Sequence, residues 1–332
     1  MLCLDVTDDA LEQALRLKCN LIISHHPLIF FPLKKITLES GRTSKLIYKL
    51  IQNNLSLLSY HTNLDFTHDG VNHQLAKKLK LSDLKYLVPI TDKSMKLVVF
   101  MPKSDLEAVS NAIFAAGGGI IGEYSNCSFT SEGTGSFMGS EKSTPTIGEK
   151  SRLEKVEEIR LEVLVSEGNI SSVTKAMKNA HSYEEPAYDI YPLKNNETKY
   201  GMGIIGNLEA EIQEEDFLKH VATNLGCTSL KHSNFTGRKI KKVAVFGGSA
   251  SEHLTDAISA GCDAFVTSDV RYHVFQDAEN EILLVDAGHF ETESSLLPEM
   301  KKRLDDFLVK ENTDKKVFIY DGAANPVNYF NF

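Results

Sequence analysis

The chain reads Leu21-Ile22-Ile23-Ser24-His25-His26-Pro27 near its N-terminal end. An apolar run with β-branched residues of this kind predicts a buried parallel strand. In open α/β sheets, ligands bind beyond the carboxyl ends of the strands, which is where His25 and His26 stand. Adjacent side chains of a strand point to opposite faces. Both histidines can therefore face one site only if the chain turns there, as Pro27 encourages.

Three further predicted strand ends carry side chains of the same chemical kind. They are His61-Thr62-Asn63-Leu64-Asp65, Thr267-Ser268-Asp269 with His273 beyond it, and Gly288-His289-Phe290-Glu291-Thr292-Glu293. If Gly288 opens a helix, His289 and Glu293 are four residues apart and share one face. Imidazole and carboxylate groups together bind borderline or hard divalent metals. The four strand ends therefore predict a metal site assembled from both ends of the chain.

Each of these residues also has a simpler interpretation. A single histidine at a strand end, such as His61 or His273, is commonly an exposed polar residue, and Asp269 suits the cap of a helix. The segment Phe246-Gly247-Gly248-Ser249-Ala250 has backbone N–H groups that suit a phosphate. It matches no phosphate-loop or dinucleotide pattern, so a tight turn is favoured there. The metal hypothesis depends on the four strand ends taken together.

Predicted strands and helices alternate in both flanks of the chain, which indicates a parallel sheet covered on both faces. The predicted strands lie at 2–6, 21–24, 55–60, 243–246, 264–267, 282–285 and 317–320. Residues 96–198 instead follow the β-α-β-β-α-β order of the ferredoxin-like arrangement, and the polar run 194–199 reads as a linker. We therefore expect one metal-binding α/β domain of two lobes, residues 1–95 and 199–332, interrupted by an inserted ferredoxin-like α+β domain at 96–198.

The composition is that of a globular protein, with 42% hydrophobic and 24% charged residues. The net charge of -9 disfavours a general nucleic-acid or anionic-membrane surface. No apolar stretch approaches the roughly 20 residues that span a bilayer. The five cysteines are odd in number and form no CxxC pair, which fits a reducing cytosol and argues against a cysteine zinc site. We expect a cytoplasmic protein with no membrane partner; a nucleic-acid partner is disfavoured, with a local basic patch left open.

The strand-end segments resemble the metal motifs of one known family. The string Ile22 to Phe30 is similar to the first metal motif of the GTP cyclohydrolase 1 type 2 homologues, the NGG-interacting-factor-three-like proteins with a dinuclear metal centre. His61 to Asp65, Ser268 to His273 and Asp286 to Glu293 resemble the other three motifs. His181 to Leu193 is similar to the closing segment of the CutA-like, ferredoxin-like insert of longer bacterial members. The similarity runs over nearly the whole chain.

The resemblance implies a ligand set, a cofactor and an assembly. It implies two divalent metal ions per subunit, Zn, Fe, Mn or Co, held by His25, His26, Asp65, His289 and Glu293. It also implies a toroidal homohexamer whose metal pairs face an inner cavity.

On this basis we expect a metal-dependent hydrolase that acts on a small molecule, either a nucleotide, a phosphoester or a cyclic amidine. His61 and His273 would be its catalytic residues, supporting the metal ligands or donating protons. The alternative is a non-catalytic metal-binding or metal-handling hexamer whose insert senses a ligand. A ring that threads nucleic acid is disfavoured by the net charge.

The chain departs from the family at its start. Members normally have a helix and a strand, including a Trp-Asp-Asn-type segment, before the strand that here holds Leu2 to Val6. This sequence begins directly in that strand and looks N-terminally short relative to the family. We therefore expect apolar surface to be exposed near Leu2 to Val6.

Overall fold

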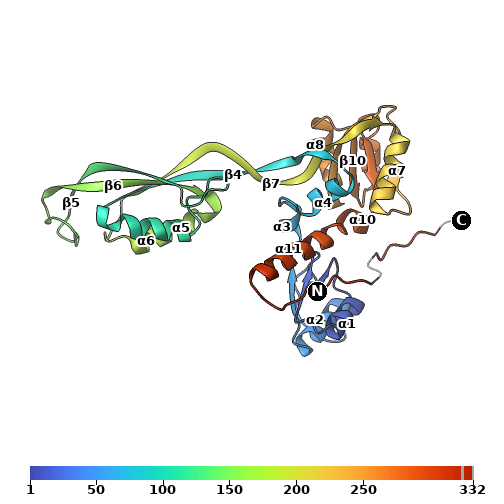
Figure 1. The fold of residues 1–332 in the computed structure, drawn as a ribbon, viewed down its shortest axis with the longest axis horizontal. Helices are drawn as coiled ribbons and strands as arrows, with labels where there is room; N and C mark the ends of the chain where they lie inside the picture. The colour runs from blue at the N-terminus through green and yellow to red at the C-terminus, as the bar shows by residue number, and fades with distance from the viewer. Residues whose placement is uncertain (323–324, 331–332) are drawn as a thin grey trace. The chain divides into compact units, whose positions relative to one another are not determined.

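A computed structural model describes residues 1–322 and 325–330, without the side chains of residues 91–92 and 195–199. The chain forms two compact units, one of Met1–Ile90 with Tyr200–Phe332 and one of Thr91–Lys199. Two long strands, β4 (Ser82–Met101) and β7 (Tyr188–Ile212), belong partly to each unit (Figure 1). Both units contain strands and helices, which confirms the mixed α/β class.

The first sheet is small and parallel. Its strands, in order, are β1 (Leu2–Cys3), β2 (Leu21–Ser24) and β3 (Ser56–Ser59). The surrounding helices are α1 (Asp8–Arg16), α2 (Arg42–Gln52) and α11 (Leu296–Lys310). Cys3 and Ile22 belong to a core with α1 and α2, whereas Leu2 and Leu4 belong to a second core with α11 (Figure 1). Burial on both faces explains the apolar run that precedes His25.

The outer edge of β1 is paired by a segment close to the C-terminus. Leu2 N donates to Phe318 O at 2.7 Å, and Tyr320 N donates to Leu2 O at 2.8 Å. Leu2 is 1% exposed and Leu4 3%, so the expectation of exposed apolar surface at residues 2–6 is wrong. This distant segment and α11 cover them instead. The strand expected at 317–320 is reduced to an isolated parallel bridge between Leu2 and Ile319.

The second sheet carries the larger core of the same unit. Its parallel strands are β9 (Ile240–Ser249), β10 (Ala264–Ser268) and β11 (Leu283–Asp286), flanked by the antiparallel β7 and β8 (Lys231–His232). Alternate residues of a strand face opposite sides. Accordingly, Val243 and Val245 join one core, while Ala244 and Phe246 join the other.

Helices cover both faces of this sheet. The first core includes residues of α4 (Val71–Lys78) and α7 (Glu214–Leu225), and the second includes residues of α8 (Leu254–Ser259) and α9 (Tyr272–Asp277). Two short helices, α3 (Thr62–Asp65) and α10 (His289–Glu293), follow β3 and β11 directly. Three single turns of 3-10 helix lie at Lys103–Asp105, Glu167–Asn169 and Ser251–His253.

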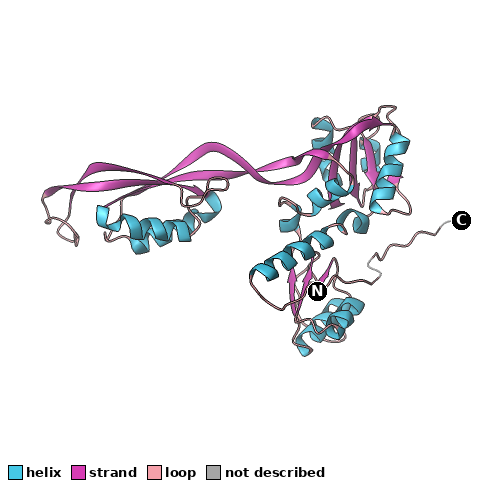
Figure 2. Ribbon diagram, viewed as in Figure 1, coloured by secondary structure: helices cyan, strands magenta, loops and turns pink. Residues whose placement is uncertain are grey.

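The unit Thr91–Lys199 has the β-α-β-β-α-β order. Between β4 and β7 it contains α5 (Leu106–Ala115), β5 (Ser128–Met138), β6 (Leu153–Ser166) and α6 (Ile170–Ala180). Its strands lie in the order β5-β6-β4-β7, and β6 is antiparallel to both of its neighbours. Both helices pack on one face of the sheet through a core that includes Val109, Ile113 and Met177 (Figure 2).

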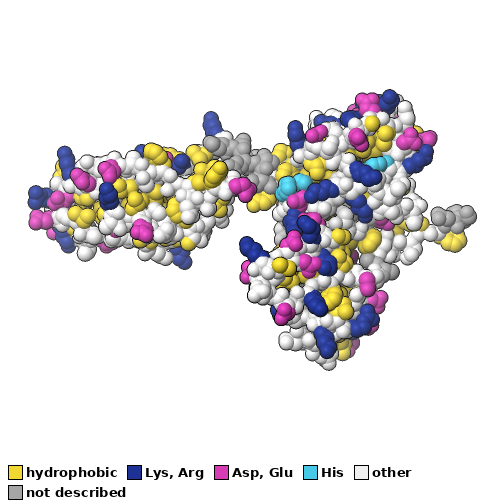
Figure 3. Space-filling model, in the orientation of Figure 1, with side chains coloured by type: hydrophobic (Ala, Val, Ile, Leu, Met, Phe, Trp, Pro, Cys, Tyr) yellow, Lys and Arg dark blue, Asp and Glu magenta, His cyan; other side chains and the backbone are white. Residues whose placement is uncertain are grey.

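The helices and the charged side chains bear on whether the partner is a membrane or a nucleic acid. None of the helices in the described part of the chain combines the length and apolar character that a membrane span requires. On the face drawn in Figure 3, basic and acidic side chains are interspersed over each unit. That face therefore shows no broad basic surface among the residues drawn in colour.

Candidate metal centre

The five predicted ligands come from three strand ends: His25 and His26 after β2, Asp65 on α3, and His289 and Glu293 on α10. The chain turns after β2, where the Ser24 hydroxyl donates to the His26 carbonyl at 2.7 Å. This turn, directly before Pro27, lets two adjacent histidines face the same site.

Glu293 lies at the centre of the group. Its Oε1 is 3.6 Å from His25 Nε2 and 3.2 Å from His289 Nε2. Its Oε2 is 3.0 Å from His26 Nε2. Asp65 Oδ1 is 3.7 Å from His25 Nε2, and the Glu293 side chain is only 4% exposed. The structure thus brings all five side chains together from opposite ends of the chain.

In each of the three histidines, Nδ1 faces away from the centre and forms a hydrogen bond. The Nδ1 contacts are His25 to Tyr60 O at 2.8 Å, His26 to Asp5 Oδ1 at 3.1 Å, and His289 to Asp269 Oδ2 at 2.6 Å. A carbonyl or carboxylate oxygen only accepts, so each Nδ1 carries a hydrogen and donates it. In the neutral imidazole the Nε2 lone pair then points inward, which is the usual arrangement of metal-binding histidines.

Two buried polar atoms of the group, His25 Nε2 and Asp65 Oδ1, have no hydrogen-bond partner among the described residues. An unpaired buried polar atom costs about 1–3 kcal/mol, so these atoms favour a bound partner. Two overlapping sets, His25 with His26 and His61, and His26 with His289 and Glu293, each have their ligand atoms within 4.8 Å of one another. The residues therefore fit a divalent metal that takes nitrogen and oxygen ligands.

Known proteins are similar to this chain in sequence and in fold. The family described as Duf34/NIF3 (NGG1p interacting factor 3) matches residues 1–326. The chain belongs to the NIF3 family. A GTP cyclohydrolase 1 type 2 homolog of Halalkalibacterium halodurans is 39% identical over 328 residues, covering 98% of this chain and 88% of the relative. The Bacillus subtilis homolog is 36% identical over 331 residues, covering 99% and 88%.

A solved structure agrees with this membership. The crystal structure of the Bacillus cereus protein related to NIF3 matches this chain with a TM-score of 0.83 and 36% sequence identity. The match covers 99% of this chain and 88% of that chain. The fold described above is therefore the NIF3 fold.

Contacts with Glu293 shift the protonation of the metal-free group in this NIF3 family member. Burial lowers the pKa of His26, but hydrogen bonds to Asp5 and Glu293 outweigh it and raise this pKa to about 10. The hydrogen bond to Glu293 raises the pKa of His289 to about 9. Burial opposes the ionisation of Glu293, yet its contacts with the histidines hold its pKa well below the usual range. Imidazolium groups therefore neutralise the buried carboxylate, and metal binding must release protons.

The two predicted catalytic histidines are placed differently. The His61 ring centroid lies 5.1 Å from that of His25 and 5.5 Å from that of His26, so His61 lies at the rim of the centre. His273 is on α9, where its Nδ1 lies 3.1 Å from Gln276 Oε1 of the same helix. The structure brings His61 to the ligands but shows no contact of His273 with them among the described residues, and its catalytic role stays a prediction.

The sequence analysis missed Asp5, and for Asp269 it left open a metal-type residue at a strand end and a helix cap. Asp5 follows β1 and Asp269 follows β10, so both stand at the same kind of strand end as the predicted ligands. Asp5 could have been found in the same way as Asp269, by examining the residues that follow each predicted strand. Their carboxylates orient His26 and His289 from outside the centre.

Two glycines bring β9 against Glu293. The tight turn expected at 246–250 is wrong for Gly247 and Gly248, because both lie within β9, where the pairing with β10 shifts register. Gly247 N donates to Asn72 Oδ1 at 2.8 Å, and Asn72 Nδ2 donates to Asp65 O at 2.8 Å. Asn72 thus ties this wall of the site to the helix that carries Asp65.

Replacing Asp269 by Asn should weaken metal binding by about 10–100-fold. The Asn amide can donate to His289 Nδ1, which favours the tautomer whose Nε2 carries hydrogen and cannot bind metal. Competition with a chromophoric chelator measures the affinity. Asp256→Asn is the matched control, because that carboxylate pairs with His253 Nδ1 at 2.8 Å elsewhere in the chain. Equal affinities in the two variants would contradict the role given to Asp269.

Raising the pH should destabilise the metal-free protein. The pKa values of His26 and His289 are raised from 6.5 to about 10 and about 9. The stability that they contribute is therefore fully present below about pH 6.5 and is lost as the pH rises through these values. Denaturant titration in a chelator should show a lower free energy of unfolding at about pH 9.5 than at about pH 7. In His289→Gln the free energy of unfolding should decrease less over this pH range. A decrease equal to that of the wild type would refute the role given to His289.

Proposed function

We propose that this NIF3 family member is a metal-dependent hydrolase with a dinuclear centre. The observation that carries the proposal is the pair of buried, unpaired ligand atoms beside Glu293, His25 Nε2 and Asp65 Oδ1. Two groups that share His26, one with His25 and His61 and one with His289 and Glu293, could each hold an ion, and Glu293 contacts His25, His26 and His289. The remaining ligands would be His25, His26, Asp65 and His289. Zn, Fe, Mn and Co all accept a mixed set of this kind.

The residues of the chain would prepare the site for hydrolysis. A bound divalent ion supplies Lewis acidity, which makes water nucleophilic near neutral pH. Asp5 and Asp269 keep their imidazoles in the binding tautomer. Burial of Glu293 lowers the local dielectric and so strengthens the interactions of charged groups there. Burial also lowers the pKa of His61, and a neutral imidazole at the rim can take up a proton and return it.

The proposed substrates are nucleotides, phosphoesters and cyclic amidines such as the purine ring of GTP. All three present polar groups that a metal centre can polarise. The relatives are named GTP cyclohydrolase 1 type 2 homolog, and this name supports testing GTP first.

A substrate screen tests the proposal. Protein prepared without added metal is reconstituted with each of the four metals and assayed against the three substrate classes. Turnover should require metal and should be abolished by His26→Ala. His68→Ala is the matched control, because that side chain is 73% exposed. Metal binding with no turnover on any substrate would favour the non-catalytic alternative.

That alternative is a metal-binding or metal-handling protein whose insert senses a ligand. The unit Thr91–Lys199 contains a cavity of about 450 Å³, lined by Glu158, Tyr183 and Glu184 among others, which supports ligand binding there. We also propose, from its β-α-β-β-α-β order, that this unit is a CutA-like domain. A small molecule that raises the thermal midpoint of the wild type but not of Tyr183→Ala would support sensing.

We further propose that the protein is a cytoplasmic homohexamer with its metal centres facing an inner cavity. The loop after β2 exposes Phe30 and Phe31 by 69% and 75%, and adjacent exposed apolar residues favour contact between copies. Light scattering coupled to size exclusion should give six chains per particle. A monomer at micromolar concentration would refute the hexamer.

A further inference from the structure

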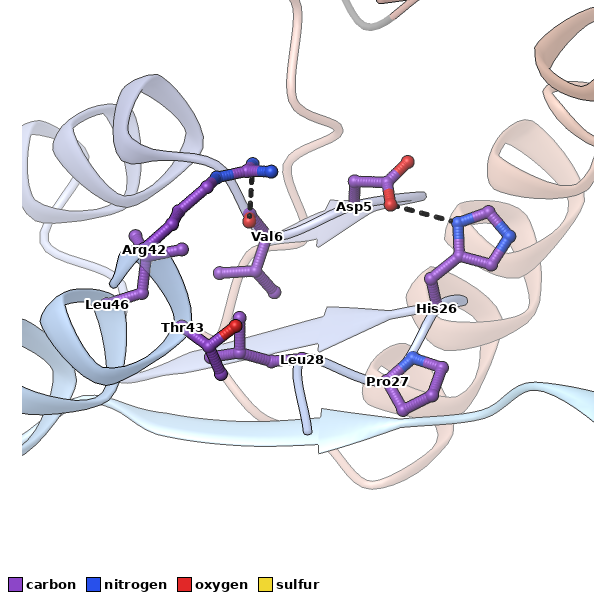
Figure 4. A pocket seen from close by; sticks show the side chains of 8 residues that line it. All are labelled: Asp5, Val6, His26, Pro27, Leu28, Arg42, Thr43 and Leu46. Carbon is purple, nitrogen blue, oxygen red and sulfur yellow. Dashed lines mark hydrogen bonds and ion pairs between the residues drawn. The ribbon is translucent and has the colours of Figure 1, made fainter. Parts of the chain in front are cut away.

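A small polar cavity of about 130 Å³ adjoins the metal centre (Figure 4). It is lined by Asp5, Val6, His26, Pro27, Leu28, Arg42, Thr43 and Leu46. His26 and its partner Asp5 form the wall next to the centre. Arg42 and Thr43, the first two residues of α2, form the opposite wall. The cavity therefore lies between a proposed metal ligand and a guanidinium group.

Arg42 has unused hydrogen-bonding capacity at this cavity. Its Nη2 donates to Val6 O at 3.3 Å, as the dashed line in Figure 4 shows. A guanidinium has five N–H donors in a fixed fork. The described residues give Arg42 no ion pair with a carboxylate. Asp5 lines the same cavity, but its carboxylate is engaged by His26. Arg42 is exposed, so its charge and its remaining donors are accessible to a molecule bound in the cavity.

The wall formed by Arg42 and Thr43 is also the start of α2. The residue before it, Gly41, provides no side-chain cap for the helix, so the first backbone N–H groups receive no acceptor from that residue. The Thr43 hydroxyl has no hydrogen bond within the described part of the chain. Arginine, hydroxyl and helix N–H groups are the donors that proteins use for phosphate.

We infer that this cavity binds a phosphate group of the substrate. The inference rests on the proposed hydrolase function and narrows its substrate class. A phosphate anchored by Arg42 would leave the adjoining part of the same molecule beside His26, where the metals would act. The scissile bond would then lie outside the anchored phosphate. A nucleotide fits this description, because its sugar and base extend beyond the phosphate.

Phosphate binding to the metal-free protein tests the inference without requiring turnover. Chelator-treated wild-type protein is titrated with inorganic phosphate by calorimetry. Arg42→Ala should weaken binding by about tenfold or more, with Arg42→Lys intermediate, since lysine keeps the charge but loses the fork. Arg16→Ala, which removes an exposed arginine at the end of α1, should change binding by less than about twofold.

Two outcomes would overturn the inference. One is equal phosphate affinity in Arg42→Ala, Arg16→Ala and the wild type. The other is acetate binding at Arg42 as tightly as phosphate, because the site would then recognise carboxylates. Failure to find any turnover would count against the hydrolase but would leave the calorimetric result intact. Once a nucleotide substrate is found, Arg42→Ala should raise KM with little change in kcat; an unchanged KM would overturn the assignment.

Discussion

Glu293→Gln is expected to abolish stoichiometric metal binding, with an affinity loss of more than about 100-fold. Replacing a residue that only orients a metal ligand typically lowers metal affinity by about 10–100-fold. The effect at Glu293 should be larger, because its carboxylate faces three Nε2 atoms at 3.0–3.6 Å. The substitution keeps the shape of the side chain and removes the charge. Elemental analysis after dialysis gives the stoichiometry, and chelator competition gives the affinity.

Glu291→Gln provides the control for this experiment. Glu291 lies on the same short helix, and its Oε1 accepts from Asn325 Nδ2 at 2.8 Å. The variant should keep its metal. Full metal content in Glu293→Gln would remove Glu293 from the ligand set and with it the dinuclear proposal.

Gly248→Ala should both destabilise the protein and weaken metal binding by more than about tenfold. Gly248 has a φ of +70°, and a Cβ there would lie 2.5 Å from Glu293 Oε1 and 3.5 Å from His289 Nε2. The left-handed backbone alone costs roughly 1 kcal/mol for a residue with a side chain. The close contact adds a second effect, because the buried carboxylate must move away from its imidazole partners.

Gly226→Ala separates these two effects. Gly226 has a similar φ of +77°, yet a Cβ there would meet nothing within 4 Å. It should lower the thermal midpoint through backbone strain and leave the metal affinity unchanged. If the two variants have the same metal affinity, Gly248 does not shape the site.

Much of the site is readable from the sequence because local rules determine it. The separation of His289 and Glu293 on one helical turn places both on the same face. The apolar run before His25 fixes which end of β2 carries the histidines. The same rules predict the β-α-β-β-α-β order of the insert, since each of its elements has its own periodic pattern.

The remaining features depend on contacts between distant segments. In the sequence, Gly248 resembles a glycine of a turn. The structure shows that it leaves room for the Glu293 carboxylate. The pairing of Leu2 with residues near Ile319 joins two ends that no local pattern connects. Strands β4 and β7 extend beyond the predicted insert boundaries at 96 and 198, and the run 194–199, expected as a linker, falls within the bounds of β7. The polar composition of this run predicts a linker, but the run belongs to β7, which pairs with β4.

The order of the ligands along the chain has a consequence for biosynthesis. The first ligands, His25 and His26, leave the ribosome early, and Glu293 leaves it only after most of the chain has been made. The growing polypeptide therefore carries an incomplete set of ligands for most of its synthesis. If these residues bind metal as proposed, the full centre can form only after the C-terminal segment has been made, and an interrupted product that ends before Glu293 would lack a proposed ligand. Occupancy of the centre would then report that the chain has been completed and folded.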